Sequence, residues 1–490
     1  MAPPDDGLGP AAALRGRAAS VLRGRTGRLF YEHYEGASLA AIADAAELPH
    51  ALAFRWRRIL QTRARLLRRR GLRQHILLAP DAHCVFRDEL PHGVTVASPS
   101  PGARFAAIAA GIDGLTVIDP EPSLVAARGG LDVFHANDTH WSGFGARIAY
   151  DALMAALPAG LTQGRLSARD VVYRFRRAYG DMGALVEPEM AVEHAVPEVP
   201  GRNPVRAFRR AAPTRDNWTR VACADGTGRA MVAGDSFLVP LIPFLAASFA
   251  RTDLLAATAR LHPEIVDAEK PDAVVLQMAT RRIAYPPDDH RAETAWEIFA
   301  QDSDSPAAAA TSAAFADRAE GRTEAAIGCL RAAAHAGDHP ALRFHAAALL
   351  QEEGRFAESE PELRAGLAQR DDRPALWHLL NIALRHLGRP REALDASARA
   401  VALLPDNGLY ASHHGYNLLA AGRAADAVAA MNLCRRDVSD CEALCYWLAQ
   451  ARLRAGDAAG AMGDAVDCLL LAPGHAKVPG LLAAIRDRME

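Results

Sequence analysis

The chain has 490 residues, half of them hydrophobic, and a formal net charge of −2 at pH 7. This length exceeds one ordinary domain and supplies enough apolar side chains for two cores. A nearly neutral chain gives no reason to expect nucleic-acid binding. No stretch reaches the roughly 18 uninterrupted apolar residues of a transmembrane helix.

The start of the chain, residues 1–26, is predicted to be an extension that precedes the first domain. Its arginines are not followed by the continuous apolar segment of a secretory signal. A cytoplasmic location is therefore expected, with a periplasmic one as the alternative if the start is misassigned. The seven cysteines are odd in number and lack paired metal-ligand spacing, which predicts free thiols in a reducing compartment.

Residues 55–73 are rich in arginine. Such a segment can form a patch that binds an anionic surface, or an amphipathic helix whose arginines lie in solvent. The second interpretation is favoured, because Phe54, Ile59, Leu66 and Leu67 can form the buried face of that helix.

Short apolar runs alternate with helical segments in the residues that follow. Buried strands are expected at residues 75–79, 115–120, 229–233 and 271–278, and helices at residues 103–110 and 145–157. This alternation predicts an α/β domain with a largely parallel sheet. In such sheets functional residues collect where strands end and helices begin.

The first of two short polar strings is Asp138-Thr139-His140-Trp141, which follows an apolar run. In an extended segment the side chains of Asp138 and His140 project to the same side, so the carboxylate can fix the imidazole tautomer. Taken alone, Asp-x-His is as often a metal-ligand pair or a surface loop. Trp141 either stacks on a sugar ring or walls the site by packing, and packing is favoured.

The second string, Gly234-Asp235-Ser236-Phe237, follows the strand expected at residues 229–233. Gly234 permits a sharp turn, and a serine that opens the next helix lies beside backbone N–H groups that can stabilise an oxyanion. The alternative is that Asp235 and Ser236 only cap that helix. A hydroxyl, an imidazole and a carboxylate together are the parts of a serine acyl-transfer site.

The residues between these strings are less informative. Arg174, Arg176 and Arg177 either hold an acidic sugar or coat a helix, and coating is favoured. The spacing of the histidines and acidic residues matches no compact metal site, so no metal is expected. No glycine-rich phosphate loop stands at a strand–helix junction, and no cofactor is expected.

The C-terminal part contains a repeat of about 34 residues. Each repeat places a glycine before an alanine-rich helical pattern, which is typical of the tetratricopeptide repeat: the glycine forms a tight turn and the alanines let paired helices pack closely. We therefore expect an all-α solenoid in which Cys441 and Cys445 are buried. The repeat glycines are Gly321, Gly354, Gly388, Gly422 and Gly456.

These patterns divide the chain into four parts. A polar stretch before the alanine-rich helices marks the junction between the two domains. The predicted parts are an extension at residues 1–26, an α/β domain at 27–287, a linker at 288–305 and the repeat domain at 306–490.

The order of the motifs resembles a known family. Asp-x-His-Trp first and Gly-Asp-Ser later is the order of the SGNH hydrolase-like domain of the alginate O-acetyltransferase type, the AlgX/AlgJ group. The resemblance extends over residues 27–287 and is specific through the order of its motifs, not through any one of them. The segments that support it are residues 27–30, 79–83, 90–91, 117–119, 137–141, 145–146, 180–183, 234–237 and 270–275.

The resemblance implies a role for each residue of the two strings. Ser236 corresponds to the nucleophile, His140 to the general base and Asp138 to the acid that orients the base. The oxyanion of the reaction would then be held by backbone N–H groups at the turn before Ser236.

The resemblance also implies a substrate or oxyanion site that contains Gly234, Asp235, Trp141 and Arg281. Arg281 fits the position of an arginine that follows the last strand of the family's domain. The acidic residue that often stands beside that arginine is replaced by Thr280. The sequence therefore predicts no adjacent ionic partner for Arg281.

The implied function is O-acetyl transfer to a hydroxyl of a polysaccharide or other glycan through an acyl-serine. The repeats would dock a partner protein, such as a membrane protein that donates the acetyl group. A carbohydrate acetylesterase is the alternative, because the same site releases acetate if water replaces the sugar hydroxyl. A non-catalytic scaffold that recruits partners through its repeats is a third.

Overall fold

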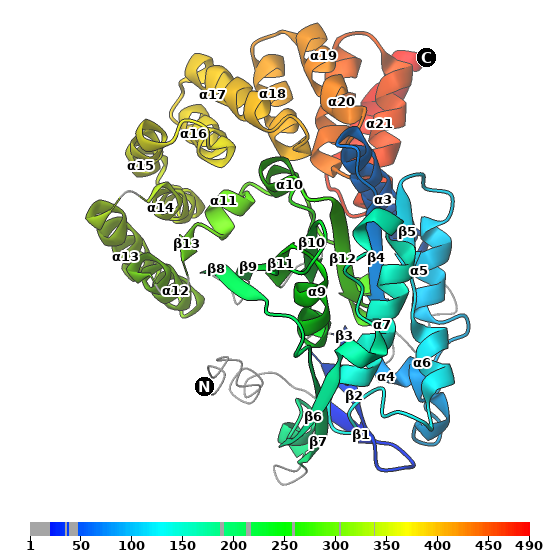
Figure 1. Cartoon of the computed structure of the whole chain (residues 1–490). Coiled ribbons are helices and arrows are strands. Elements are labelled where there is room, and N and C mark those ends of the chain that lie inside the picture. Colours follow the sequence, from blue (N-terminus) through cyan, green and yellow to red (C-terminus); the bar gives the residue numbers. More distant parts are fainter. Residues whose placement is uncertain are drawn as a thin grey trace.

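The molecule has two parts: an α/β domain, and an arch of paired helices that curves back over one side of it (Figure 1). No helix in the described part of the chain is both long and apolar enough to cross a membrane. The computed structural model describes residues 20–34, 37–38, 48–186, 191–211, 217–256, 260–302, 305–337 and 339–490.

An eight-stranded sheet forms the centre of the α/β domain. Its strands are β4 Gln74–Ala79, β5 Leu115–Ile118, β8 Val205–Ala211, β9 Asn217–Ala222, β10 Arg229–Gly234, β11 Arg251–Ala256, β12 Ala273–Ala279 and β13 Gln301–Asp302. They are ordered β13-β8-β9-β11-β10-β12-β4-β5. The run from β11 to β5 is parallel, and the three strands beyond β11 are antiparallel. The largely parallel sheet predicted from the sequence is confirmed.

The sheet is covered on both faces. Every residue of β4 and β12 is buried, as expected for strands that read as continuous apolar runs. Helices α7 and α9 pack on one face, and α3, α5 and α10 pack on the other. The bounds of these helices are α3 His50–Arg69, α5 Pro101–Ala109, α7 Gly143–Ala156, α9 Ile242–Ser248 and α10 Pro263–Glu269.

A small antiparallel sheet lies beside this core. Strand β2 (Leu29–Tyr34) pairs with β1 (Ser20–Arg23) and with β3 (Ala37–Ser38). β1 lies in the stretch that was expected to be an extension. Arg28, next to β2, donates two hydrogen bonds of 3.1 Å to main-chain carbonyls in the loop before Asp138. The small sheet thus fastens one of the two polar strings.

Helix α3 differs from the prediction in the surroundings of its arginines. Ile59, Leu66 and Leu67 are buried as expected, and Phe54 is half-buried. The arginines were expected in solvent, but Arg63 has no exposed surface and forms an ion pair with Asp289. The prediction fails for Arg63, because the repeats cover the side of α3 that faces away from the sheet (Figure 1). Arg57, Arg68 and Arg69 are exposed as predicted.

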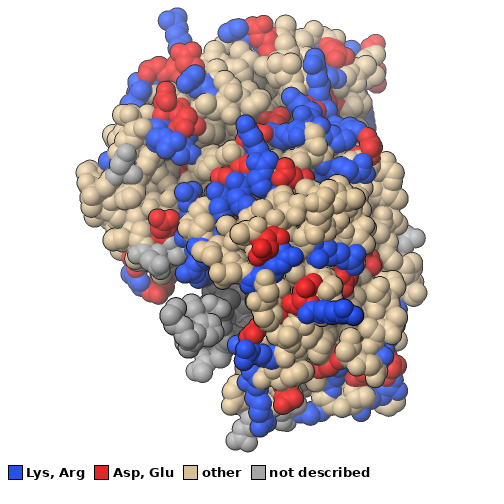
Figure 2. Space-filling model, viewed as in Figure 1, with Lys and Arg blue, Asp and Glu red and all other residues tan. Residues whose placement is uncertain are grey.

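Residues 172–178 form a strand and not the expected helix. This strand, β6 (Val172–Ala178), pairs with β7 (Val192–Glu198) in a hairpin at the foot of the molecule (Figure 1). The valine and aromatic residues that alternate with arginines here favour a strand. Basic and acidic side chains are interspersed over the face of the molecule seen in Figure 2.

The arch consists of antiparallel helix pairs, as the repeat predicts. The five repeat glycines have φ between +71° and +89°, the left-handed region that favours glycine, and each lies between paired helices. Cys441 and Cys445 are buried, and all seven cysteines are free thiols. The helices are α12 Pro306–Ala319, α13 Thr323–Ala336, α14 Pro340–Glu352, α15 Phe356–Gln369, α16 Pro374–His386, α17 Pro390–Leu403, α18 Gly408–Ala420, α19 Ala424–Arg435, α20 Glu442–Arg454, α21 Ala458–Leu471 and α22 Val478–Met489.

The segment predicted as a linker, residues 288–305, contains regular elements. Helix α11 (Ala295–Ile298) contacts α14, and β13 pairs with β8 at the edge of the sheet. The segment therefore packs against both parts of the molecule.

Candidate active site

Ser236 lies at the carboxyl end of β10, where the chain turns into the 3-10 helix η4 (Ser236–Leu241). Gly234 lets the turn pass close to β12, because a Cβ atom there would lie 2.6 Å from Gln277 Oε1 and 3.1 Å from Gln277 Cβ. The Asp235 carboxylate holds the turn: it accepts one N–H from within η4 at 3.1 Å and another from the end of β12 at 2.7 Å. Ser236 is left exposed on this turn.

Asp138 and His140 lie in a loop that is closed by a bridge between Phe134 and Trp141. The loop is bent and not extended, because Asp138 Oδ1 accepts the His140 backbone N–H at 2.9 Å. The same oxygen accepts the Nδ1–H of the imidazole at 2.7 Å. The turn, and not the alternation of a strand, brings the two side chains together.

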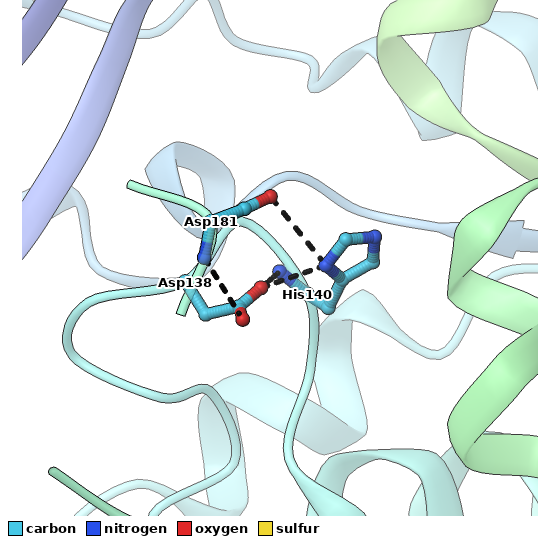
Figure 3. Close-up of side chains that lie close together, drawn as sticks. All are labelled: Asp138, His140 and Asp181. Atoms are coloured by element: carbon cyan, nitrogen blue, oxygen red, sulfur yellow. Dashed lines mark hydrogen bonds and ion pairs between the residues drawn. The ribbon is translucent and has the colours of Figure 1, made fainter. Parts of the chain in front are cut away.

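The imidazole joins the two strings. His140 Nε2 lies 2.6 Å from Ser236 Oγ. Figure 3 shows that Nδ1 faces the carboxylates while Nε2 points away from them. A base within hydrogen-bond distance of a hydroxyl, itself oriented by an acid, is the arrangement that activates a nucleophile.

A second carboxylate, Asp181, lies beside the same imidazole. It accepts hydrogen bonds from the backbone N–H of Thr139, at 2.7 Å, and from its hydroxyl, and its Oδ2 is 3.6 Å from His140 Nδ1 (Figure 3). Its own N–H donates to Asp138 Oδ2 at 3.3 Å. Asp181 belongs to residues 180–183, which support the family resemblance, but nothing in the sequence assigns it a role.

The close spacing separates the pKa values of these groups. Burial disfavours the Asp138 carboxylate, but the contacts with His140 outweigh burial and hold its pKa well below the usual range. Burial, together with the charge of Asp138, raises the pKa of Asp181 to about 6. For His140, burial opposes protonation, but the two carboxylates prevail and raise its pKa.

Asp138, His140 and Asp181 are close enough together to hold a metal ion, and within the described ranges they are the one such group. The atoms that would bind the ion, however, already make hydrogen bonds within the protein. These atoms are Asp138 Oδ1, His140 Nδ1 and both carboxylate oxygens of Asp181. These hydrogen bonds account for the cluster. The absence of a metal stays a prediction.

The structure corrects the placement of Trp141 in the substrate site. Its side chain has no exposed surface, and its indole N–H donates to the Phe237 carbonyl at 3.0 Å. Trp141 therefore packs between the two polar strings, the favoured alternative, and cannot stack on a sugar ring. The sequence does not predict this contact, because Trp141 and Phe237 are 96 positions apart.

Arg281, in the 3-10 helix η5 (Thr280–Ala284), has an ionic partner that the sequence does not suggest. Its guanidinium donates to Asp81, at the end of β4, at 2.7 Å, and both side chains are buried. It also lies 5.2 Å from the centre of the Phe237 ring, behind the turn that carries Ser236. Arg281 therefore lies in the core behind the Ser236 turn, and its place in a substrate or oxyanion site stays a prediction.

Residues 21–250 match a family model described as an SGNH hydrolase-like domain of the acetyltransferase AlgX. No curated protein matches the chain significantly. Among solved structures, Bacillus cereus PatB1 with a sulfonyl adduct is 12% identical, with 55% of this chain and 97% of that chain covered and a TM-score of 0.45.

Two further solved structures resemble one part each. The O-acetyltransferase domain of Pseudomonas putida AlgJ is 17% identical, covering 55% of this chain and 94% of its own, with a TM-score of 0.36. A tetratricopeptide-repeat protein of Thermus thermophilus is 17% identical, covering 36% of this chain and 95% of its own, with a TM-score of 0.29.

The stretch that matches the family model includes both polar strings and the strand that ends at the Ser236 turn. The predicted order of motifs and the predicted sheet are both found within or beside this stretch. Residues 21–250 thus match the SGNH hydrolase-like domain of the acetyltransferase AlgX, and the part of the chain that follows consists of paired helices that repeat about every 34 residues, as in tetratricopeptide repeats.

Proposed function

We propose that Ser236, His140 and Asp138 form a catalytic triad that transfers an acetyl group to a glycan hydroxyl through an acyl-serine. The observation that supports this best is the 2.6 Å contact between Ser236 Oγ and His140 Nε2, with Nδ1 held 2.7 Å from Asp138. Acyl transfer needs a hydroxyl, a base and an orienting acid in this order.

In the proposed first step, His140 Nε2 takes the proton of Ser236 Oγ as the oxygen attacks the acetyl carbonyl of the donor. The tetrahedral intermediate collapses, and the leaving group of the donor receives the proton from His140. A glycan hydroxyl then gives its proton to His140 and attacks the acyl carbon, and Ser236 Oγ regains the proton. Asp138 stays ionised throughout and stabilises the imidazolium.

The proposed oxyanion donor at this turn is the Ser236 backbone N–H. The next N–H along the chain, from Phe237, already donates to Asp235. Gly234 and Asp235 would therefore act by fixing the turn and not by contacting the oxyanion. A helix-opening turn of this kind directs N–H groups toward developing negative charge.

Hydrolysis is a second candidate outcome, because Ser236 is exposed and water can reach an acyl group on it. Intact-mass measurement after incubation with 4-nitrophenyl acetate, with and without an acidic oligosaccharide, separates the outcomes. We expect one acetyl adduct on the wild type and on Ser167→Ala, an exposed serine used as control, and none on Ser236→Ala. Movement of the acetyl group to the sugar would support transfer, and loss only to water would support an esterase.

If the protein forms no Ser236-dependent adduct, the result would contradict the proposal and favour the non-catalytic scaffold. We further propose that the repeats dock a partner protein that supplies the acetyl group, such as a membrane protein. The support for docking is the repeat architecture itself, which presents extended surfaces to other chains.

Replacing Asp181 with asparagine is expected to move the acidic limb of the kcat/KM–pH profile to lower pH. The general base must be neutral, and removing a neighbouring negative charge lowers the pKa of His140 toward its ordinary value. The profile of Asp113→Asn, at an exposed carboxylate, should match the wild type. Equal loss of activity at every pH would instead indicate that Asp181 only holds the loop.

A further inference from the structure

Residues 288–299 run along the inner side of the repeat arch. His290 uses both ring nitrogens: Nε2–H donates to Asp440 at 3.0 Å, and Nδ1 accepts the backbone N–H of Gly408 at 3.2 Å. The backbone carbonyl of Arg291 accepts a hydrogen bond from the Asn407 side chain at 3.2 Å. The backbone carbonyl of Ala292 accepts one from the Tyr410 hydroxyl at 2.6 Å. This part of the segment is held at the start of α18 and just before α20.

The next residues of the segment contact the preceding repeats. The guanidinium of Arg373, which opens α16, lies 5.2 Å from the centre of the Trp296 ring. His345, on α14, contacts the carbonyl oxygen of Glu297 at 3.2 Å. As the segment advances, its partners therefore step back along the arch from α20 to α18, α16 and α14.

The segment thus runs in the opposite direction to the order of the repeats. In each helix pair that it contacts, it contacts the first helix or the residues just before that helix. Figure 1 shows α11, the helical part of the segment, on the inner side of the arch next to α14. Side chains of the repeats contact main-chain carbonyls of the segment, which is how a groove can hold an extended peptide. Asn407, Tyr410, His345 and Asp440 are all buried where the segment covers them.

Helix α3 fastens the far end of the arch to the α/β domain. Arg58 donates two hydrogen bonds, of 2.8 and 2.9 Å, to Asp467 on α21. Arg65 donates at 2.9 Å to the Asp437 carbonyl and at 2.6 Å to the Ser439 hydroxyl. The arch is thus attached to the α/β domain near its end as well as through the segment.

We propose that the inner groove of the repeats is a binding site for the chain's own residues 288–299, so that the groove is filled and a partner protein has only the outer faces of the repeats available. Two features fix this segment in the groove. Both ring nitrogens of His290 make hydrogen bonds with the repeats, and backbone carbonyls of the segment accept hydrogen bonds from one repeat after another. The repeats then act first as a brace that holds the catalytic domain.

Hydrogen–deuterium exchange of the full-length chain tests this directly. We expect the amides of residues 288–299 to exchange slowly in the wild type. They should exchange at least about tenfold faster in the double variant Asn407→Ala/Tyr410→Phe, because two hydrogen bonds to the segment are lost. Asn407 also caps α18, so Tyr410→Phe alone, which keeps that cap, separates the two effects. Tyr416→Phe removes a hydroxyl from the same helix, where the ring contacts Trp447, and should leave the exchange unchanged.

Tyr410→Phe alone keeps the packing of the repeats and serves if the double variant does not fold; it should still raise the exchange about threefold or more. Wild-type exchange as fast as that of an unstructured peptide would overturn the proposal, as would exchange that neither variant changes. A labelled synthetic peptide of residues 286–300 should not bind the wild type. Binding that depends on Asn407 and Tyr410 would show that the groove is open.

Discussion

Replacing His140 with alanine is expected to lower the rate of acetyl transfer by about a thousandfold or more. The imidazole is the group that connects the Ser236 hydroxyl, at 2.6 Å, with the Asp138 carboxylate, at 2.7 Å. In the proposed mechanism, the serine without it loses the base that takes its proton, and the leaving group loses the acid that protonates it. The rate of 4-nitrophenol release under saturating donor measures the effect.

The control for this variant is His92→Ala, at an exposed histidine, which should keep wild-type activity. A His140→Ala protein that retains a tenth of the wild-type rate would show that another group activates Ser236. The neighbouring His135 is the first to consider, but its pKa is lowered to about 3 by burial and by the nearby His194. It stacks on His194 with the ring centres 3.7 Å apart.

Replacing Asp81 with alanine is expected to lower the free energy of unfolding by about 3–5 kcal/mol. The carboxylate accepts hydrogen bonds from the Arg281 guanidinium at 2.7 Å, from the Arg281 backbone N–H at 3.1 Å and from the Thr280 hydroxyl at 2.9 Å. Its loss leaves the buried positive charge of Arg281 without this carboxylate, and burial of a charge is costly when the opposite charge is removed. Denaturant unfolding of the full chain measures the change.

The matched control is Glu198→Ala, which breaks the exposed pair between Glu198 and Arg174 and should cost no more than about 1 kcal/mol. Asp81→Asn preserves the size of the side chain and should fall between the two. A cost below about 1 kcal/mol for Asp81→Ala would contradict the view that this pair supports the Ser236 turn. Weakened acetylation in Asp81→Asn would connect the pair to the site, since Arg281 lies against Phe237.

The candidate site could be identified from the sequence in its central residues but not in its surroundings. Asp138, His140 and Ser236 were found because their chemistry and order are both visible in the chain. Asp181 was missed as a group that faces the imidazole, although it contacts the residue next to His140. Nothing local distinguishes it from any other aspartate after a glycine.

The sequence by itself determined the elements that depend on local pattern. Continuous apolar runs produced the central strands, because a strand buried on both faces must be apolar at every position. The 34-residue period predicted the paired helices. Each period contains the glycine that forms the turn between two helices and the alanines that let the two helices pack closely. A helix was wrongly expected over β6, where alternating aromatic residues and arginines favour a strand.

The tertiary structure alone decided which distant charges meet and which surfaces are free. Arg281 pairs with Asp81 across 200 positions, and Arg58 on α3 reaches Asp467 across 409. The segment expected to link the domains instead lies in the groove of the repeats. The physical reason is the same in each case: a side chain's environment depends on what packs against it, and periodicity specifies only which face is apolar and not what covers it.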